Sequence, residues 1–176
     1  FELQDDMPLT VLPSVQLVIL EFFPLNWALA RLLLQTCHEN CLQQVEKLLK
    51  KPFDPNLEGI DCNTLPIHVA ASSGHMEVVG LLLEARADIE ATTSVEGLSA
   101  LHCAAREGHV DVLKFLLRAG AAKDAPMLDG EGATALHIGA QNGQLEVVQV
   151  LLEANADVNK ATVSGATAVI FGTKPN

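Results

Sequence analysis

Three histidines recur at regular intervals along the chain and are its first candidates for chemistry. His68, His102 and His137 stand 34 and 35 residues apart. Histidine is well suited to acid–base catalysis near neutral pH and is also a common metal ligand. Catalysis would require a nucleophile or a carboxylate at a constant distance from each imidazole, and no such residue recurs. We therefore interpret these histidines as structural residues, and we expect no catalytic residues and no enzyme activity in this chain.

The cysteines are the second set of residues that could do chemistry. Cys37, His38 and Cys41 lie close together, whereas Cys62 and Cys103 are remote in sequence. Two thiols and one imidazole form an incomplete set for a tetrahedral zinc site. A small buried thiol packs like an apolar side chain, and we favour this interpretation for Cys37 and for an unreactive Cys103. No glycine-rich phosphate loop is present, so we expect neither a metal nor a cofactor.

Composition limits the possible fold and partners. Hydrophobic residues make up 49% of the chain and aromatic residues only 4%, which favours a helical core of Leu, Val and Ala. The formal net charge of −11 repels phosphates, so we expect no nucleic-acid partner. An acidic surface suits a basic protein partner, although it also serves solubility alone. The four cysteines form no dense disulfide framework, which indicates reduced thiols and an intracellular setting.

The three histidines lie in a segment that the chain repeats. Each copy contains a short apolar run, a glycine, and a second apolar run at helical spacing. Because glycine adopts a left-handed conformation without a Cβ clash, each copy predicts two helices separated by a turn. The second run is apolar around much of its circumference and must be covered by neighbouring copies. The copies span residues 65–90, 99–124 and 134–159, and their glycines are Gly74, Gly108 and Gly143.

These copies resemble the ankyrin repeat, whose signature is Thr-Pro-Leu-His-x-Ala and whose period is near 33 residues. The chain has Leu-Pro-Ile-His-Val-Ala at 65–70, Ser-Ala-Leu-His-Cys-Ala at 99–104 and Thr-Ala-Leu-His-Ile-Gly at 134–139. The resemblance implies an all-α solenoid of stacked helix-turn-helix units joined by β-hairpin-like loops. It also implies that each histidine hydrogen-bonds the backbone at the start of its repeat.

The repeat pattern predicts where helices end and where loops lengthen. Arg86, Gly120 and Asn155 follow the second helices and are expected to adopt a left-handed conformation, at some cost for Arg86. The residues in excess of the 33-residue period should fall in the hairpin tips, the longest at 125–132. In a degenerate first repeat, Asn40 occupies the place of Gly74.

The resemblance divides the chain into six parts. We predict an N-terminal extension or cap at 1–26, a degenerate first repeat at 27–62, full repeats at 63–97, 98–131 and 132–164, and a partial repeat at 165–176. In the partial repeat, the apolar residues Val169, Ile170 and Phe171 are expected to lie against the preceding repeat.

The N-terminal segment does not fit the repeat. Residues 11–25 are apolar, but Pro13 and Pro24 bound a run of only ten residues, too short to span a membrane. The segment either packs on the first repeat or docks on a partner or a membrane-bound complex. The chain starts at Phe1, which suggests a fragment or a removed leader. We therefore expect a cytoplasmic protein, with an organelle as the alternative.

The function that the resemblance implies is protein binding along the concave face of the solenoid. We therefore predict a protein–protein interaction module or scaffold with a protein partner and no small-molecule substrate. The alternatives are a structural accessory subunit of a larger assembly and a regulatory segment of a larger enzyme. The predicted partner-binding residues are Asp61, Thr64, Ser72, Ser73, Val95, Glu96, Leu98, Arg106, Glu107, Glu131, Ala133, Gln141 and Asn142.

Overall fold

The computed structural model describes residues 28–50, 54–57 and 64–172. This part of the chain contains helices joined by turns, together with one isolated antiparallel bridge between Thr92 and Ser99. The predicted all-α solenoid of stacked helix-turn-helix units is confirmed. After a helix over residues 28–38, the elements are α2 (Leu42–Leu49), α3 (Pro66–Ser72), α4 (Met76–Glu84), α5 (Ala100–Glu107), α6 (Val110–Arg118), α7 (Ala135–Gln141), α8 (Leu145–Glu153) and α9 (Ala168–Gly172).

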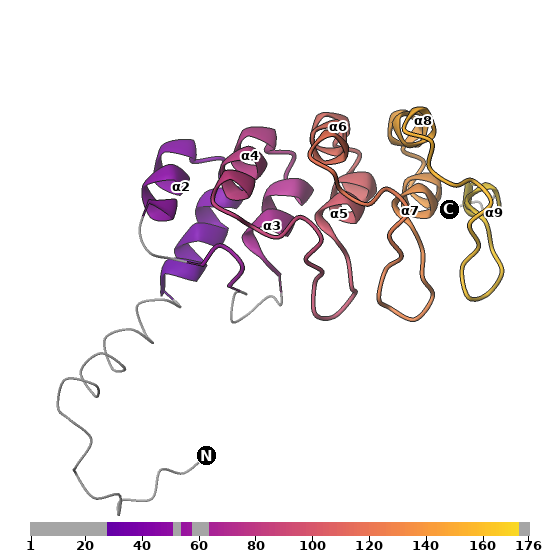
Figure 1. Ribbon diagram of the computed structural model, residues 1–176, viewed down its shortest axis with the longest axis horizontal. Helices are drawn as coiled ribbons and strands as arrows, with labels where there is room; N and C mark the ends of the chain where they lie inside the picture. Colours follow the sequence, from indigo (N-terminus) through magenta and orange to yellow (C-terminus); the bar gives the residue numbers. More distant parts are fainter. Residues whose placement is uncertain (1–27, 51–53, 58–63, 173–176) are drawn as a thin grey trace, which may run out of the picture.

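The helices form two rows (Figure 1). The outer helices α2, α4, α6 and α8 follow one another along one edge, and each contacts the next. The inner helices α3, α5, α7 and α9 form the second row, again with contacts between neighbours. Hairpin loops project from the inner row on the side away from the outer helices. Each repeat therefore presents a hairpin and an inner helix on one side of the molecule and an outer helix on the other.

The core lies between the two rows and runs through the stack. Val78, Val79 and Leu82 of α4 are buried, as are Leu113 and Leu116 of α6. Burying one such side chain stabilises a fold by roughly 1.5–3 kcal/mol. Each outer helix is flanked by other outer helices as well as by its own inner helix, so its apolar surface is covered from several directions. Stability consequently depends on neighbouring repeats, as expected for a solenoid.

Left-handed residues end the helices at the expected places. Asn40, Arg86 and Asn155 have positive φ angles of 55°, 70° and 58°. Asn40 adopts the left-handed conformation of Gly74, so the chain turns between the helix over residues 28–38 and α2 as it does between α3 and α4. Arg86 takes this conformation despite its Cβ, which costs about 1 kcal/mol.

The hairpins account for the uneven spacing of the repeats. In each hairpin the first residue donates its main-chain N–H to the carbonyl of the residue that closes the loop. Four, five and three residues lie between the paired residues in successive hairpins, which matches histidine-position spacings of 34, 35 and 33. The prediction that the middle tip is the longest is therefore confirmed. The pairs are Thr93 with Leu98, Met127 with Ala133, and Thr162 with Ala166.

The repeated histidines connect the start of each inner helix to a hairpin. The N–H of Ser99 donates to Nδ1 of His102 at 3.1 Å, so that ring nitrogen is unprotonated. The proton is therefore on Nε2, which donates to the carbonyl of Ala125 at 3.0 Å. His68 and His137 form the same two kinds of bond, of which the one to the main chain at the start of the repeat is the bond that the family resemblance implies.

Side chains at the start of three outer helices reach back to the preceding repeat. Each contacts a main-chain carbonyl at the end of the preceding inner helix, where no intrahelical donor is available. These bonds fix the offset between adjacent repeats. They join His75 to the His38 carbonyl at 2.9 Å, His109 to the Ser72 carbonyl at 2.9 Å, and Gln144 to the Arg106 carbonyl at 3.4 Å.

A second set of contacts between repeats is made by the loops that follow the outer helices in sequence. The side chains of Asn56, Glu90 and Asp124 occupy equivalent positions in successive repeats. Each accepts a hydrogen bond from a main-chain N–H of the following repeat. The loop that follows one outer helix is thereby held at a constant position relative to the loop that follows the next. The donors are Asp88 at 2.8 Å, Ala122 at 2.8 Å and Asp157 at 2.9 Å.

The expectation for the last repeat is wrong in part. Helix α9 contacts α7, and Ala168 is buried, but Val169 is 69% exposed and Ile170 is 48% exposed. The equivalent position in the preceding repeat, Leu136, is buried because α8 covers α7, and the described residues contain no helix that covers α9 in this way. The side chain of Phe171 lies outside the described set.

Two glycines at equivalent hairpin positions provide a test of contact between adjacent loops. Gly97 and Gly165 have φ angles of +64° and +80°. A Cβ on Gly97 would lie 2.5 Å from the backbone nitrogen of Leu128, whereas a Cβ on Gly165 would meet nothing within 4 Å. We expect Gly165→Ala to lower the free energy of unfolding by about 1 kcal/mol through backbone strain alone. Gly97→Ala should cost at least about 2 kcal/mol, because the backbone of the next hairpin must also move. Equal losses in urea unfolding would contradict the observed hairpin contact.

The histidine network predicts a dependence of stability on pH. Burial lowers the pKa of His102 from 6.5 to about 4. Between these values the unfolded chain binds a proton that the folded chain does not, so the free energy of unfolding falls as the pH falls through this window. The loss amounts to about 3 kcal/mol for this residue. His102→Ala removes this pH-dependent contribution to stability. The difference in unfolding free energy between parent and variant should therefore narrow from pH 7.5 to pH 4.5. A difference that stays constant in urea titrations at these pH values would exclude this linkage.

Candidate functional site

Two adjoining hollows lie on the side of the solenoid formed by the hairpins and inner helices. The first has a volume of about 240 Å³ and lies between α3, α5 and the hairpin over residues 92–99. The second has a volume of about 530 Å³ and lies between α5, α7 and the hairpins that precede them. Both are bordered by Val95, Glu96, Leu98 and Arg106, so they form one continuous concave surface.

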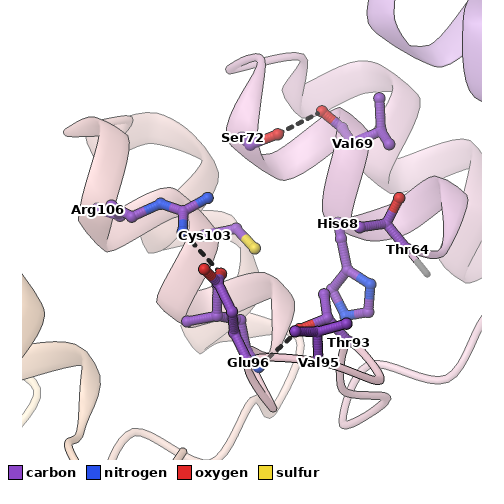
Figure 2. Close-up of a pocket in the computed structure, with 10 residues that line it drawn as sticks. Thr64, His68, Val69, Ser72, Thr93, Val95, Glu96, Cys103 and Arg106 are labelled. Carbon is purple, nitrogen blue, oxygen red and sulfur yellow. Dashed lines mark hydrogen bonds and ion pairs between the residues drawn. The ribbon is translucent and has the colours of Figure 1, made fainter. Parts of the chain in front are cut away.

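The inner helices contribute equivalent pairs of residues to this surface. The two residues of each pair are three positions apart in the helix and therefore lie on the same helix face. The pair of α3 is Val69 and Ser72, and in Figure 2 both side chains lie on the same side of the first hollow as His68. The remaining pairs are Cys103 with Arg106 in α5, and Ile138 with Gln141 in α7.

Arg106 stands where the two hollows meet and is held by two carboxylates. Its Nη1 lies 3.1 Å from Oε2 of Glu96, and its Nε lies 3.2 Å from Oε1 of Glu107 (Figure 2 shows the first contact). The three side chains are between 39% and 57% exposed, so each ion pair contributes at most about 1 kcal/mol to stability. The main effect of the pairs is to orient the guanidinium across the surface.

Asp129 orders the tip of the second hairpin. Its Oδ1 accepts the main-chain N–H of Glu131 at 3.0 Å and that of Gly132 at 3.2 Å. A carboxylate at the start of a turn commonly stabilises it in this way. These bonds fix the backbone that carries Glu131. Asp129 and Glu131 both border the second hollow.

Two of the titratable groups that line the first hollow, His68 and Cys103, are engaged in the scaffold. The two ring nitrogens of His68 face main-chain atoms, the N–H of Leu65 and the carbonyl of Ala91. Burial raises the pKa of the Cys103 thiol to about 11, so the thiol is protonated at neutral pH and is a poor nucleophile. These two residues therefore act through packing and hydrogen bonding.

The cysteine cluster singled out in the sequence is also part of the scaffold. Cys37 is fully buried at the position equivalent to Ala71, and burial raises the pKa of its thiol to about 12. Cys41 is half-buried, and its sulfur lies 3.9 Å from a carboxylate oxygen of Glu39. Within the described residues, no three His, Cys, Asp or Glu side chains gather as metal ligands would. Cys62 lies outside those residues.

Most of the predicted partner-binding residues line the two hollows. Ser73 and Glu107 lie beside them and make other contacts, Ser73 with His38 and Glu107 with Arg106. Asp61 lies outside the described residues, as does the N-terminal segment over 1–26. The residues that the structure brings together are Thr64, Ser72, Val95, Glu96, Leu98, Arg106, Glu131, Ala133, Gln141 and Asn142.

Two of these residues are not surface residues as expected. Leu98 is only 2% exposed and Ala133 only 9%. Leu98 immediately precedes Ser99, the N-cap residue of α5, and Ala133 immediately precedes Thr134, the N-cap residue of α7. The chain enters the core at both places. They form the base of the hollows, and a partner could contact only a small part of either side chain.

Several lining residues were missed by the sequence analysis. Ile138 could have been found, because it precedes the predicted Gln141 by three residues and is equivalent to Val69 and Cys103. Met127 is equivalent to Thr93, which lines the first hollow, but neither position was predicted. Asp129 had no such signal, because it lies among the five intervening residues of the longest hairpin, which have no full counterpart in the other loops.

Comparison with known proteins identifies the family. No curated protein matches the chain. The family model described as ankyrin repeats (3 copies) matches residues 32–127 and again residues 93–162, together well over half of the chain. The first match starts within the helix over residues 28–38 and so includes most of the segment predicted to be a degenerate first repeat. No helix in the described residues has the length and apolar character needed to cross a membrane. The histidine-anchored inner helices, the left-handed turns and these matches agree, and the chain belongs to the ankyrin repeat family.

Proposed function

We propose that this protein is an interaction module that binds a partner protein along the concave surface formed by the two hollows. Ankyrin repeats are generally protein–protein interaction modules. The observation that supports this particular surface is the composition of its lining. It combines apolar side chains with carboxylates, amides and one guanidinium, which is the mixture found where protein surfaces associate.

Val95 illustrates why this surface suits a partner. The side chain lies at a hairpin tip, borders both hollows and is 72% exposed. It contributes little to the core, since the hairpin is closed by Thr93 and Leu98 instead. A partner that covered Val95 would remove apolar area from water at the centre of the surface, where interface energy is concentrated.

The charge of the surface favours a basic partner. Glu96, Asp129 and Glu131 border the second hollow, where Arg106 is the single basic residue of the lining. The whole chain carries a formal charge of −11, which would speed the approach of a cationic protein. Complementary charge chiefly affects association rate and specificity, and the apolar contacts supply more of the affinity.

The size of the hollows indicates an extended interface. A stable protein complex buries roughly 800 Å² on each partner, which exceeds the lining of two such hollows. The partner would therefore also cover the rims, including Glu107 and the hairpin tips. A binding surface that extends over three repeats would depend on the rigid offsets between them.

Charge reversal along this surface tests the proposal. The variant Glu96→Lys, Glu107→Lys and Glu131→Lys should reduce recovery of native partners by about tenfold, because each substitution replaces attraction by repulsion. Recovery is measured by quantitative mass spectrometry after a native pull-down with the full chain. Fold integrity is checked by circular dichroism, since exposed ion pairs contribute little stability.

A matched control changes the same charge on the opposite side. Glu77, Glu84 and Glu153 are exposed on the outer helices α4 and α8, away from both hollows. Their replacement by Lys changes the net charge equally and should leave recovery near the parent level. Equal recovery with both triple variants would place partner binding elsewhere on the molecule.

A further inference from the structure

We propose that the second hollow recognises an extended peptide segment in which a Lys or Arg stands next to a large apolar residue. This inference rests on the proposed function, because it names the chemistry of the partner segment at one part of that surface. Three features carry it: an apolar base, an excess of carboxylates, and carboxamides that can pair with a peptide backbone.

The base of the second hollow is apolar and comes from separate parts of the chain. Beside the buried Leu98 and Ala133, Met127 of the longest hairpin and Ile138 of α7 line this base, and Val95 of the preceding hairpin borders it. Met127 is partly buried and Ile138 is 6% exposed, so both are supported by the core, while Val95 stands free at the rim. Methionine adapts its shape to different neighbours. This base therefore suits a flexible or branched apolar side chain of the partner.

The carboxylates around this base are only partly neutralised. Glu96 pairs with Arg106, but within the described residues neither Asp129 nor Glu131 forms an ion pair with a basic side chain. The lining therefore carries three carboxylates against one guanidinium. The first hollow differs, because Glu96 and Arg106 balance each other in its lining. Charge complementarity consequently directs a cationic side chain to the second hollow.

Two carboxamides border the hollow on the side of α7. Gln141 and Asn142 are both exposed, and Asn142 already donates its Nδ2 to the carbonyl of Ile138 at 2.9 Å. That bond orients the amide through one of its donors and does not involve its acceptor oxygen. A carboxamide has both donors and an acceptor, and it therefore pairs well with a peptide group. This feature favours a peptide over a free polyamine or a metal ion.

The dimensions agree with a short segment. A volume of about 530 Å³ lies within the range of ligand sites that enclose a few side chains. The hollow adjoins the first hollow through shared lining residues, so an extended chain could continue from one into the other. An extended segment places successive side chains on opposite sides, which would direct the apolar residue to the base and the basic residue to Asp129 and Glu131.

A random peptide library tests this inference directly. The full chain is used to select from a phage-displayed library of random 12-residue peptides. We expect enrichment of sequences in which Lys or Arg stands directly next to Leu, Ile, Met or Phe. The strongest peptide is then synthesised with a fluorescent label, and its dissociation constant is measured by fluorescence anisotropy.

Two variants with matched controls locate the binding site. Glu131→Lys should weaken binding of the selected peptide by about tenfold, and Val95→Ser by about threefold. Glu153→Lys makes the same charge change on α8, and Val163→Ser removes an equally exposed valine that does not line the hollow. Both controls should bind as the parent does. Peptide variants with Lys or Arg replaced by Glu, or with the apolar residue replaced by Ala, should lose affinity to a similar extent.

Several results would overturn the inference. One is a selection that enriches no common sequence or enriches acidic peptides. Another is equal affinity of the selected peptide for the two variants of the second hollow and for their two controls. A third is displacement of the peptide by spermidine at equal concentration. Failure here is distinguishable from failure of the proposed function. Peptides that bind the first hollow, and are lost with Thr64 or Ser72 substitutions, would leave the concave surface as the binding face. Loss of native partners in the triple charge reversal without any effect on the peptide would do the same.

Discussion

The buried imidazole at the start of each complete inner helix is the interaction on which the rest of the structure depends. His102 accepts the N–H of Ser99 and donates to the carbonyl of Ala125, so one ring joins a helix start to a loop 23 residues later. A buried imidazole without both partners would cost roughly 1–3 kcal/mol for each unsatisfied group. The hairpin is therefore held at a fixed distance from the helix. Because Glu96 and Asp129 lie on these hairpins, the geometry of the concave surface follows from the same bonds.

Much of the scaffold could be read from the sequence because its requirements are local and recur. A left-handed residue must follow each helix, and the chain supplies Gly74, Arg86 and Asn155 at the expected positions. The same logic extended the repeat upstream, where Asn40 is not glycine but adopts its conformation. The hairpin lengths were also predictable, since a helix–turn–helix unit of constant length leaves the loop as the place for extra residues.

The candidate site was less predictable because it forms between repeats. Aligning copies identifies which positions are equivalent, but it does not say how deeply each is buried. Leu98 and Ala133 were expected at the surface and are instead buried where the chain enters the core. The exposure of Val169 and Ile170 has the opposite cause: an apolar residue is buried only where a neighbouring helix covers it. The burial of a residue in a solenoid depends on two adjacent repeats, so it cannot be predicted from the sequence of one repeat alone.

The distribution of charge separates the residues that build the repeat from those that could select a partner. The scaffold satisfies its buried polar groups with main-chain partners, as with His68 and the carbonyl of Ala91 at 2.8 Å. The concave surface instead uses exposed side chains whose ion pairs contribute little to stability. If the proposed cationic segment engaged Glu96, Arg106 would still have a carboxylate beside it, because its Nε lies 3.2 Å from Oε1 of Glu107. The pairing of one guanidinium with two carboxylates would thus let the proposed surface accept a positive charge without leaving Arg106 unpaired.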